Sequence, residues 1–213
     1  VLHTARKMAG TPFDTAVFTL GTNHVYVERA TGEIVDNCQK RPQREFEERE
    51  LTIDECADAL REAISLLRTS NPRLRVILTV SPIRYAKYGY HESQLSKAVL
   101  LLAADKLTKE ASGEVYYFPA YEIVNDELRD YRFYKADMLH PNEQAVAYIW
   151  EQLVATCFSA TAKQFLKEWR PIKEALAHRP FHPEAASYQD FLKKTKEAAR
   201  LLKQKYPNLE LKE

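Results

Sequence analysis

The sequence predicts an α/β protein, a three-layer α/β/α sandwich in which helices cover both faces of a parallel sheet. Short apolar runs alternate along the chain with longer segments whose apolar residues recur at helical spacing, which is the pattern of such a sheet. The chain has 213 residues, 45% of them hydrophobic, enough to bury a substantial core. Because these sheets bind ligands beyond the carboxyl ends of their strands, we expect functional residues in the loops that follow the strands.

The first predicted strand lies in residues 13–23, FDTAVFTLGTN, a short apolar run that ends at Gly21. Its composition indicates a buried parallel strand leading into a loop. Residues 25–37, VYVERATGEIVDN, predict two short extended pieces around a turn at Thr31 and Gly32.

Two further strands are predicted downstream. Residues 75–85, RVILTVSPIRY, indicate a second buried strand, which Pro82 ends at the sheet edge where loops carry function. Residues 114–124, EVYYFPAYEIV, are the candidate third strand.

Helices are predicted between and after these strands. Thr52 and Glu55 have the spacing of a capping box, and the helix that they open should stop near Asn71. A second long helix is predicted over residues 93–113, and another follows the segment KADMLHPN at residues 135–142. The first of these helices places its apolar residues on one face: Ile53, Cys56, Leu60, Ile64 and Leu67.

The last part of the chain departs from this alternation of strands and helices. We therefore divide the whole chain into an α/β domain, residues 1–158, and a helical extension, residues 159–213. The extension contains two predicted helices separated by the proline-rich HRPFHPEAA. We expect the extension to pack on the main domain through one stripe: Tyr188, Phe191, Leu192, Thr195, Ala199 and Leu202.

Charge argues against nucleic acid and membrane as partners. The formal net charge is +1, which gives no general attraction to nucleic acid or acidic lipid. The lysine-rich extension mixes both signs of charge and lacks a clear basic stripe. No apolar run approaches the roughly 20 residues that a membrane helix needs.

The three cysteines favour a cytoplasmic protein. Cys38, Cys56 and Cys157 are odd in number and widely spaced, without a CxxC pair for zinc or redox chemistry. The N-terminus has no apolar signal-peptide core, and it begins with Val1. We therefore expect reduced thiols in a cytoplasmic protein, present here as a fragment or a processed form.

Asp137 and His140 are the first candidates for chemistry. A histidine that acts as a general base needs a carboxylate to fix its tautomer, and a loop entering a helix can hold the two side chains close together. The alternative is a structural role, in which Asp137 or Asn142 caps the following helix.

Gly21 and Asn23 are the second candidate pair. A backbone N–H beside a short side-chain donor at the end of a buried strand is what an oxyanion hole requires. The alternative is a turn with a local asparagine hydrogen bond.

Two weaker candidates follow. Ser81 could serve as a nucleophile, but it lacks the tight glycine-bearing turn such a serine needs. His91 and Glu92 have no spacing that supports a ligand set with Asp137, so we expect no metal site and no cofactor.

The strand ending in Gly-Thr-Asn and the Asp-x-x-His-Pro-Asn that opens a later helix resemble the SGNH hydrolase superfamily, the GDSL-like esterases, whose fold is flavodoxin-like. Over residues 10–158 the chain is more specifically similar to the GSCFA-domain family. The segments that carry this resemblance are TLGTNHVY, VDNCQKRP, TVSPIR, LSKAVL, YFPAYEIVNDELRDYRFYKADMLHPN and AVAYIWE.

The resemblance implies a role for each candidate residue. His140 would be the general base, Asp137 its orienting carboxylate, and Asn23 with the Gly21 backbone the oxyanion donors. The family usually has Asn-Cys-His-Lys where this chain has NCQK from Asn37 onward, so Asn37 is a rival for the oxyanion role.

The chain departs from the family in one important respect. The Gly-Ser-Cys-Phe-Ala block, whose serine is the expected nucleophile, is absent from this sequence. We therefore expect the sheet to lack its first strand, which leaves residues 14–20 as an apolar edge. An upstream segment or another chain should cover that edge.

These expectations define two candidate functions. The first is a bacterial cytoplasmic hydrolase that cleaves or transfers an acyl ester of a small molecule or a carbohydrate, inactive without an upstream serine. The second is a non-catalytic binding or assembly module on the same scaffold.

Overall fold

The computed structural model of the protein describes residues 13–35 and 37–207. The chain divides into two compact units, residues 1–149 and residues 150–213. This division falls inside helix α5 (Glu143–Cys157), whereas the predicted boundary, between residues 158 and 159, lies just after that helix.

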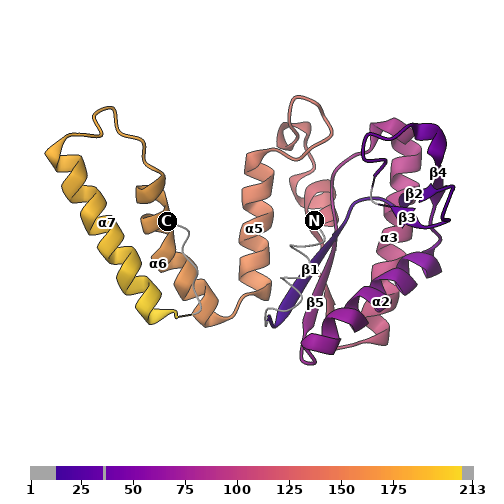
Figure 1. Ribbon diagram of the computed structural model, residues 1–213, viewed down its shortest axis with the longest axis horizontal. Coiled ribbons are helices and arrows are strands. Elements are labelled where there is room, and N and C mark those ends of the chain that lie inside the picture. The colour runs from indigo at the N-terminus through magenta and orange to yellow at the C-terminus, as the bar shows by residue number, and fades with distance from the viewer. Residues whose placement is uncertain (1–12, 36, 208–213) are drawn as a thin grey trace. The chain divides into compact units, whose positions relative to one another are not determined.

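The first unit contains the predicted parallel sheet. Its strands are β1 (Thr15–Leu20), β5 (Arg75–Val80) and β6 (Val115–Tyr117), in the order β1-β5-β6. Figure 1 shows β1 beside β5. Both neighbouring pairs are parallel, and Leu20 stands opposite Val80. The prediction of a mixed α/β protein with a parallel sheet is confirmed.

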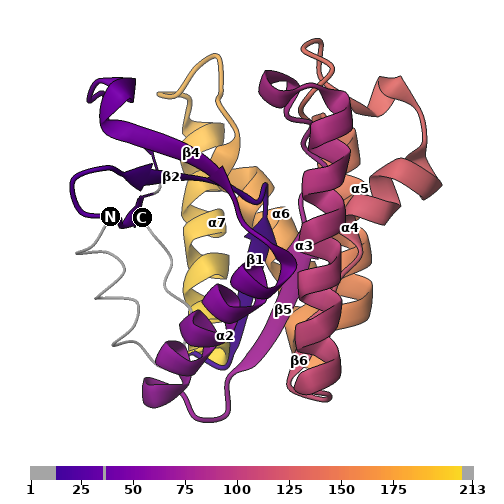
Figure 2. The same ribbon diagram turned by 90° about the vertical axis from the view of Figure 1, so that its right-hand side faces the viewer.

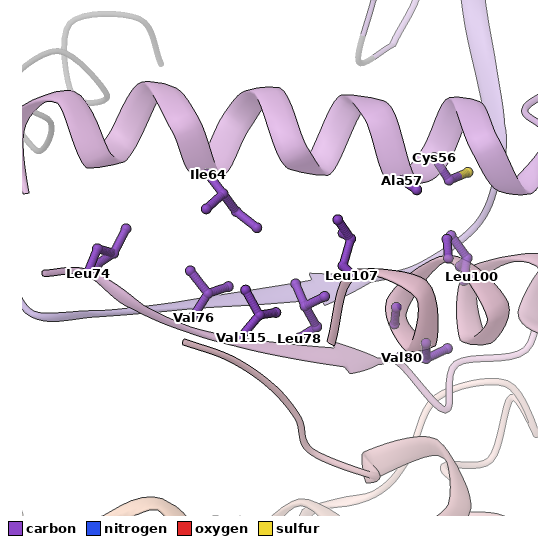
Figure 3. Close-up of a cluster of buried hydrophobic side chains, with 12 residues drawn as sticks. Cys56, Ala57, Ile64, Leu74, Val76, Leu78, Val80, Leu100, Leu107 and Val115 are labelled. Carbon is purple, nitrogen blue, oxygen red and sulfur yellow. The ribbon is translucent and has the colours of Figure 1, made fainter. Parts of the chain in front are cut away.

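Helices α2 (Ile53–Ser70) and α3 (Tyr90–Glu110) supply the core on one face of this sheet. Figure 2 shows them in front of β1 and β5, and Figure 3 shows side chains of β5 directed at α2. Thr52 and Glu55 form the predicted capping box. The buried cluster consists of Cys56, Ala57, Ile64, Leu74, Val76, Leu78, Val80, Leu100, Ala103, Ala104, Leu107 and Val115.

Strand β1 is less buried than its composition predicts. Its residues alternate between exposed and partly buried, and Val17 is 53% exposed. The alternation shows that one face of β1 packs on the core and the opposite face is exposed. Among the described residues β1 also pairs with β5 alone and so lies at a sheet edge. A covering segment or chain stays a prediction.

The third predicted strand, residues 114–124, is correct only in its first half. Strand β6 ends at Tyr117, and after Pro119 the chain turns into α4 (Ala120–Glu122) and the π-helical η3 (Ile123–Leu128). Proline fixes φ and cannot donate to a strand ladder, so extended structure stops there. The apolar residues Ile123 and Val124 are buried, but they belong to a helical segment and not to a strand.

A small antiparallel sheet accompanies the parallel one. It contains β2 (His24–Glu28), β3 (Ile34–Val35) and β4 (Phe46–Glu50) in the order β3-β2-β4. The two extended pieces predicted around Thr31 and Gly32 are β2 and β3. Strand β4 was not predicted, because four of its five residues are charged and exposed, as suits an edge strand.

Short 3-10 turns link these elements: η1 (Gln43–Glu45), η2 (Ala86–Tyr88) and η4 (Tyr131–Phe133). In the second unit, α6 (Ala160–Ala177) and α7 (Ala186–Lys205) match the two predicted helices and pack together. Between them, the Phe165 and Tyr206 rings meet edge to face at 5.2 Å, and Lys205 pairs with Glu168 at 2.6 Å.

None of the helices within residues 13–35 and 37–207 has both the length and the hydropathy needed to cross a membrane.

Replacing Leu78 by alanine tests the core. Leu78 is fully buried in the central strand, so its truncation should lower the free energy of unfolding by about 2–5 kcal/mol. Leu66→Ala is the matched control, because Leu66 is 63% exposed and its truncation should cost less than about 0.5 kcal/mol. Urea unfolding of both variants measures the difference, and equal losses would contradict the assigned core.

Candidate active site

Asp137 and His140 are in direct contact. The Asp137 Oδ2 lies 2.6 Å from the His140 Nδ1, and the Asp137 Oδ1 accepts hydrogen bonds from the backbone N–H groups of His140 at 3.0 Å and Leu139 at 2.8 Å. Met138 between them has a φ of 61°, which reverses the chain and lets one carboxylate reach all three partners.

These contacts set the charge and orientation of the pair. The backbone hydrogen bonds from His140 and Leu139, followed by the His140 side chain, lower the pKa of the Asp137 carboxyl to about 2. Asp137 is therefore ionised at neutral pH. With Nδ1 directed at the carboxylate, Nε2 is the ring nitrogen left to exchange a proton with another molecule, and about half of the His140 side chain is exposed.

Helix capping by Asp137 is not seen. The Asn142 Oδ1 accepts the Ala145 backbone N–H at 3.0 Å, so Asn142 caps α5. The Asn142 side chain also donates to the Arg132 carbonyl at 2.6 Å, which fixes the segment before the helix.

Arg84 ties the Asp137–His140 turn to the carboxyl end of β5. Its backbone N–H donates to the Leu139 carbonyl at 3.1 Å, and its guanidinium donates to the Met138 carbonyl at 3.0 Å. The same guanidinium lies against three aromatic rings, with centroid distances of 4.2 Å to Tyr90 and 5.7 Å to both Tyr131 and Tyr134. The Asp137–His140 pair therefore lies beside the loop that follows β5.

Gly21 lies next to the same loop. The Ser81 backbone N–H donates to the Leu20 carbonyl at 2.8 Å, which joins the ends of β1 and β5. A Cβ on Gly21 would stand 2.7 Å from the Tyr85 hydroxyl, so a side chain at this position would displace that ring. The Gly21 carbonyl accepts a hydrogen bond from Lys97.

Asn23 points into the protein. It is 3% exposed, and its side-chain amide donates to the Leu51 carbonyl at 2.8 Å. Its Oδ1 is buried and has no hydrogen-bond partner among the described residues. In this arrangement Asn23 organises the loop, and its role as an oxyanion donor stays a prediction.

Asn37 is exposed in the loop after β3. Its Oδ1 accepts the Gln39 backbone N–H at 2.7 Å, the hydrogen bond of an Asx turn. Gln39 and Lys40 both have left-handed backbones, with φ of 48° and 64°. The oxyanion role of Asn37 also stays a prediction.

A buried polar face on α3 was not predicted from the sequence. Ser93 accepts the Tyr85 backbone N–H at 3.1 Å, and the Ser96 Oγ lies 3.0 Å from both the Thr22 Oγ1 and the Asn23 backbone nitrogen. Lys97 completes this face. Polar residues at positions i, i+3 and i+4 of a helix share one face, so the spacing within SQLSK was a usable signal.

The side chains of the two weaker candidates have other surroundings. The Ser81 Oγ accepts the Ile83 backbone N–H at 3.3 Å, and His91 is exposed at the start of α3. Within the described ranges, no group of three His, Cys, Asp or Glu side chains is placed to hold a metal ion.

Fold and site together define an α/β protein with an Asp–His pair held beside the carboxyl edge of a parallel sheet. The model of the GSCFA family matches residues 2–153, and that of the GSCFA domain protein, C-terminal domain, matches residues 169–213. The chain therefore belongs to the GSCFA family. A search of curated proteins found no match.

Gly21→Ala tests the close approach of Tyr85. The added methyl group would overlap the hydroxyl, so we expect a loss of roughly 1–2 kcal/mol in the free energy of unfolding. In a Tyr85→Phe background that hydroxyl is gone, and the same substitution should cost clearly less. A double-mutant cycle by thermal or urea unfolding measures the coupling, and strictly additive effects would argue against the contact.

Proposed function

We propose that the protein is an SGNH-type hydrolase that hydrolyses or transfers an acyl ester, built on a three-layer α/β/α sandwich. The observation that carries this proposal is the 2.6 Å contact between the Asp137 carboxylate and the His140 Nδ1. In a hydrolase triad a carboxylate fixes the tautomer of the histidine, and the accessible Nε2 of that histidine acts as the general base.

The proposed mechanism needs a serine from outside this sequence. The serine oxygen attacks the ester carbonyl while the His140 Nε2 takes its proton, and Asp137 stabilises the imidazolium that forms. His140 then returns the proton to the leaving alcohol, and a water molecule or an acceptor alcohol releases the acyl group in the second half of the reaction. The Gly21 N–H, with Asn23 or Asn37, would stabilise the oxyanion.

The same serine-bearing segment, or another chain, would cover the outer edge of β1. On this proposal the chain by itself is inactive. A small-molecule or carbohydrate ester is the proposed substrate, and the cytoplasm is the proposed location.

A non-catalytic binding or assembly module on the same scaffold is the second candidate. The inward orientation of Asn23 favours it, because an amide that is 3% exposed offers no donor to a ligand in its present position. A protein of this kind would keep the Asp–His pair for structural reasons.

Ester hydrolysis by a longer version of the protein that carries the upstream serine distinguishes the two candidates. His140→Ala should lower kcat/KM for a chromogenic acyl ester by about 10²- to 10⁴-fold, the usual contribution of a general base. His91→Ala is the matched control, because that exposed histidine takes no part in the proposed site. Equal activity of the wild type and His140→Ala would rule out the hydrolase.

A further inference from the structure

Lys97 is a charged side chain buried at the candidate site. It is 2% exposed, and its ammonium donates to the Gly21 carbonyl and lies 5.2 Å from the centroid of the Tyr85 ring. In the described part of the chain it has no carboxylate partner. Burying an unpaired charge is costly, so a lysine in this position calls for an explanation.

The contacts around Lys97 converge on one short segment. The Gly21 carbonyl is held by the ammonium, while Thr22 and the Asn23 backbone are held by Ser96, one residue earlier on α3. The Thr22 Oγ1 also accepts the His24 backbone N–H at 3.2 Å. Neighbouring side chains of one helix therefore hold the turn that follows β1, and Lys97 supplies the one charged contact.

We propose that Lys97 is a positioning residue whose ammonium clamps the turn at Gly21–Asn23, and that this turn loosens when Lys97 loses its proton. A charge-assisted hydrogen bond to a carbonyl is stronger than the bond from a neutral amine, so deprotonation weakens the clamp without removing it. The consequence for catalysis rests on the proposed function, because this turn carries the Gly21 N–H and Asn23. The clamp itself does not depend on that function.

The surroundings of Lys97 set the pH at which the clamp weakens. Burial lowers the pKa of the Lys97 ammonium to about 8. The one titratable group that contacts the ammonium in the described structure is Tyr85, and neither the turn after β1 nor α3 directs a carboxylate at it. The ammonium form therefore predominates below about pH 8, and the clamp weakens as the pH rises through that value.

Hydrogen exchange of the Asn23 and His24 amides, followed by NMR, tests the clamp, because the Asn23 amide donates to the Ser96 Oγ and the His24 amide donates to the Thr22 Oγ1. Lys97→Met keeps an unbranched side chain of nearly the same length and removes the ammonium donor. We expect the protection factors of these two amides to fall about tenfold, the effect of losing one charge-assisted hydrogen bond. Amides of β5 should keep their protection factors. Replacing a buried charge by an apolar side chain removes its desolvation cost, so the stability of the whole domain should not fall.

The control is Lys109→Met, which removes an exposed lysine from the same helix and should leave both amides unchanged. In the wild type, the two protection factors should decline between about pH 7 and pH 9, whereas in Lys97→Met they should be independent of pH. Should Lys97→Met fail to fold, the wild-type pH series still decides.

Protection factors that are equal in the two variants, or that do not change with pH in the wild type, would overturn the proposal. Because no catalytic assay is involved, this result is independent of whether the protein hydrolyses esters.

Discussion

The parallel pairing of β1 with β5 is the constraint on which the site depends. Leu20 stands opposite Val80, so both strands end at the same level, and the Ser81 N–H bonds the Leu20 carbonyl across the gap. Gly21 and the loop to Arg84 therefore leave the sheet side by side. Since Arg84 also holds the Asp137–His140 turn, a change of strand register would separate parts that lie more than a hundred positions apart in the sequence.

Helix α3 contributes both to the apolar core and to the polar contacts that hold the loops. Leu100 and Leu107 belong to the apolar core against the sheet, whereas Ser93, Ser96 and Lys97, nearer its start, turn a polar face to the loops. The polar part lowers the stability of the fold, since within residues 13–35 and 37–207 the buried Lys97 ammonium has no carboxylate partner and the buried Asn23 Oδ1 has no hydrogen-bond donor. Concentrating such groups at one end of a well-packed domain is typical of a functional site.

Local features of this protein were predictable from sequence and long-range ones were not. The capping box at Thr52, strand β5 and the residues of the Asp–His turn depend on neighbours within a few positions, and the sequence patterns located them. By contrast, β4 is a strand only because β2 lies beside it, and β6 ends early because Pro119 and a buried helical turn follow it. The inward direction of Asn23 depends on the carbonyl of Leu51, which no pattern near Asn23 reveals.

The Asp137–His140 pair is assembled from its own turn of chain. The carboxylate binds two backbone amides and the imidazole within residues 137–140, and the left-handed Met138 provides the reversal. The contacts inside the pair are therefore local, while Arg84 anchors the turn to the loop after β5. Because these contacts join chain neighbours, the orientation of the imidazole towards Asp137 is preset by the backbone of the turn before any other group approaches the ring.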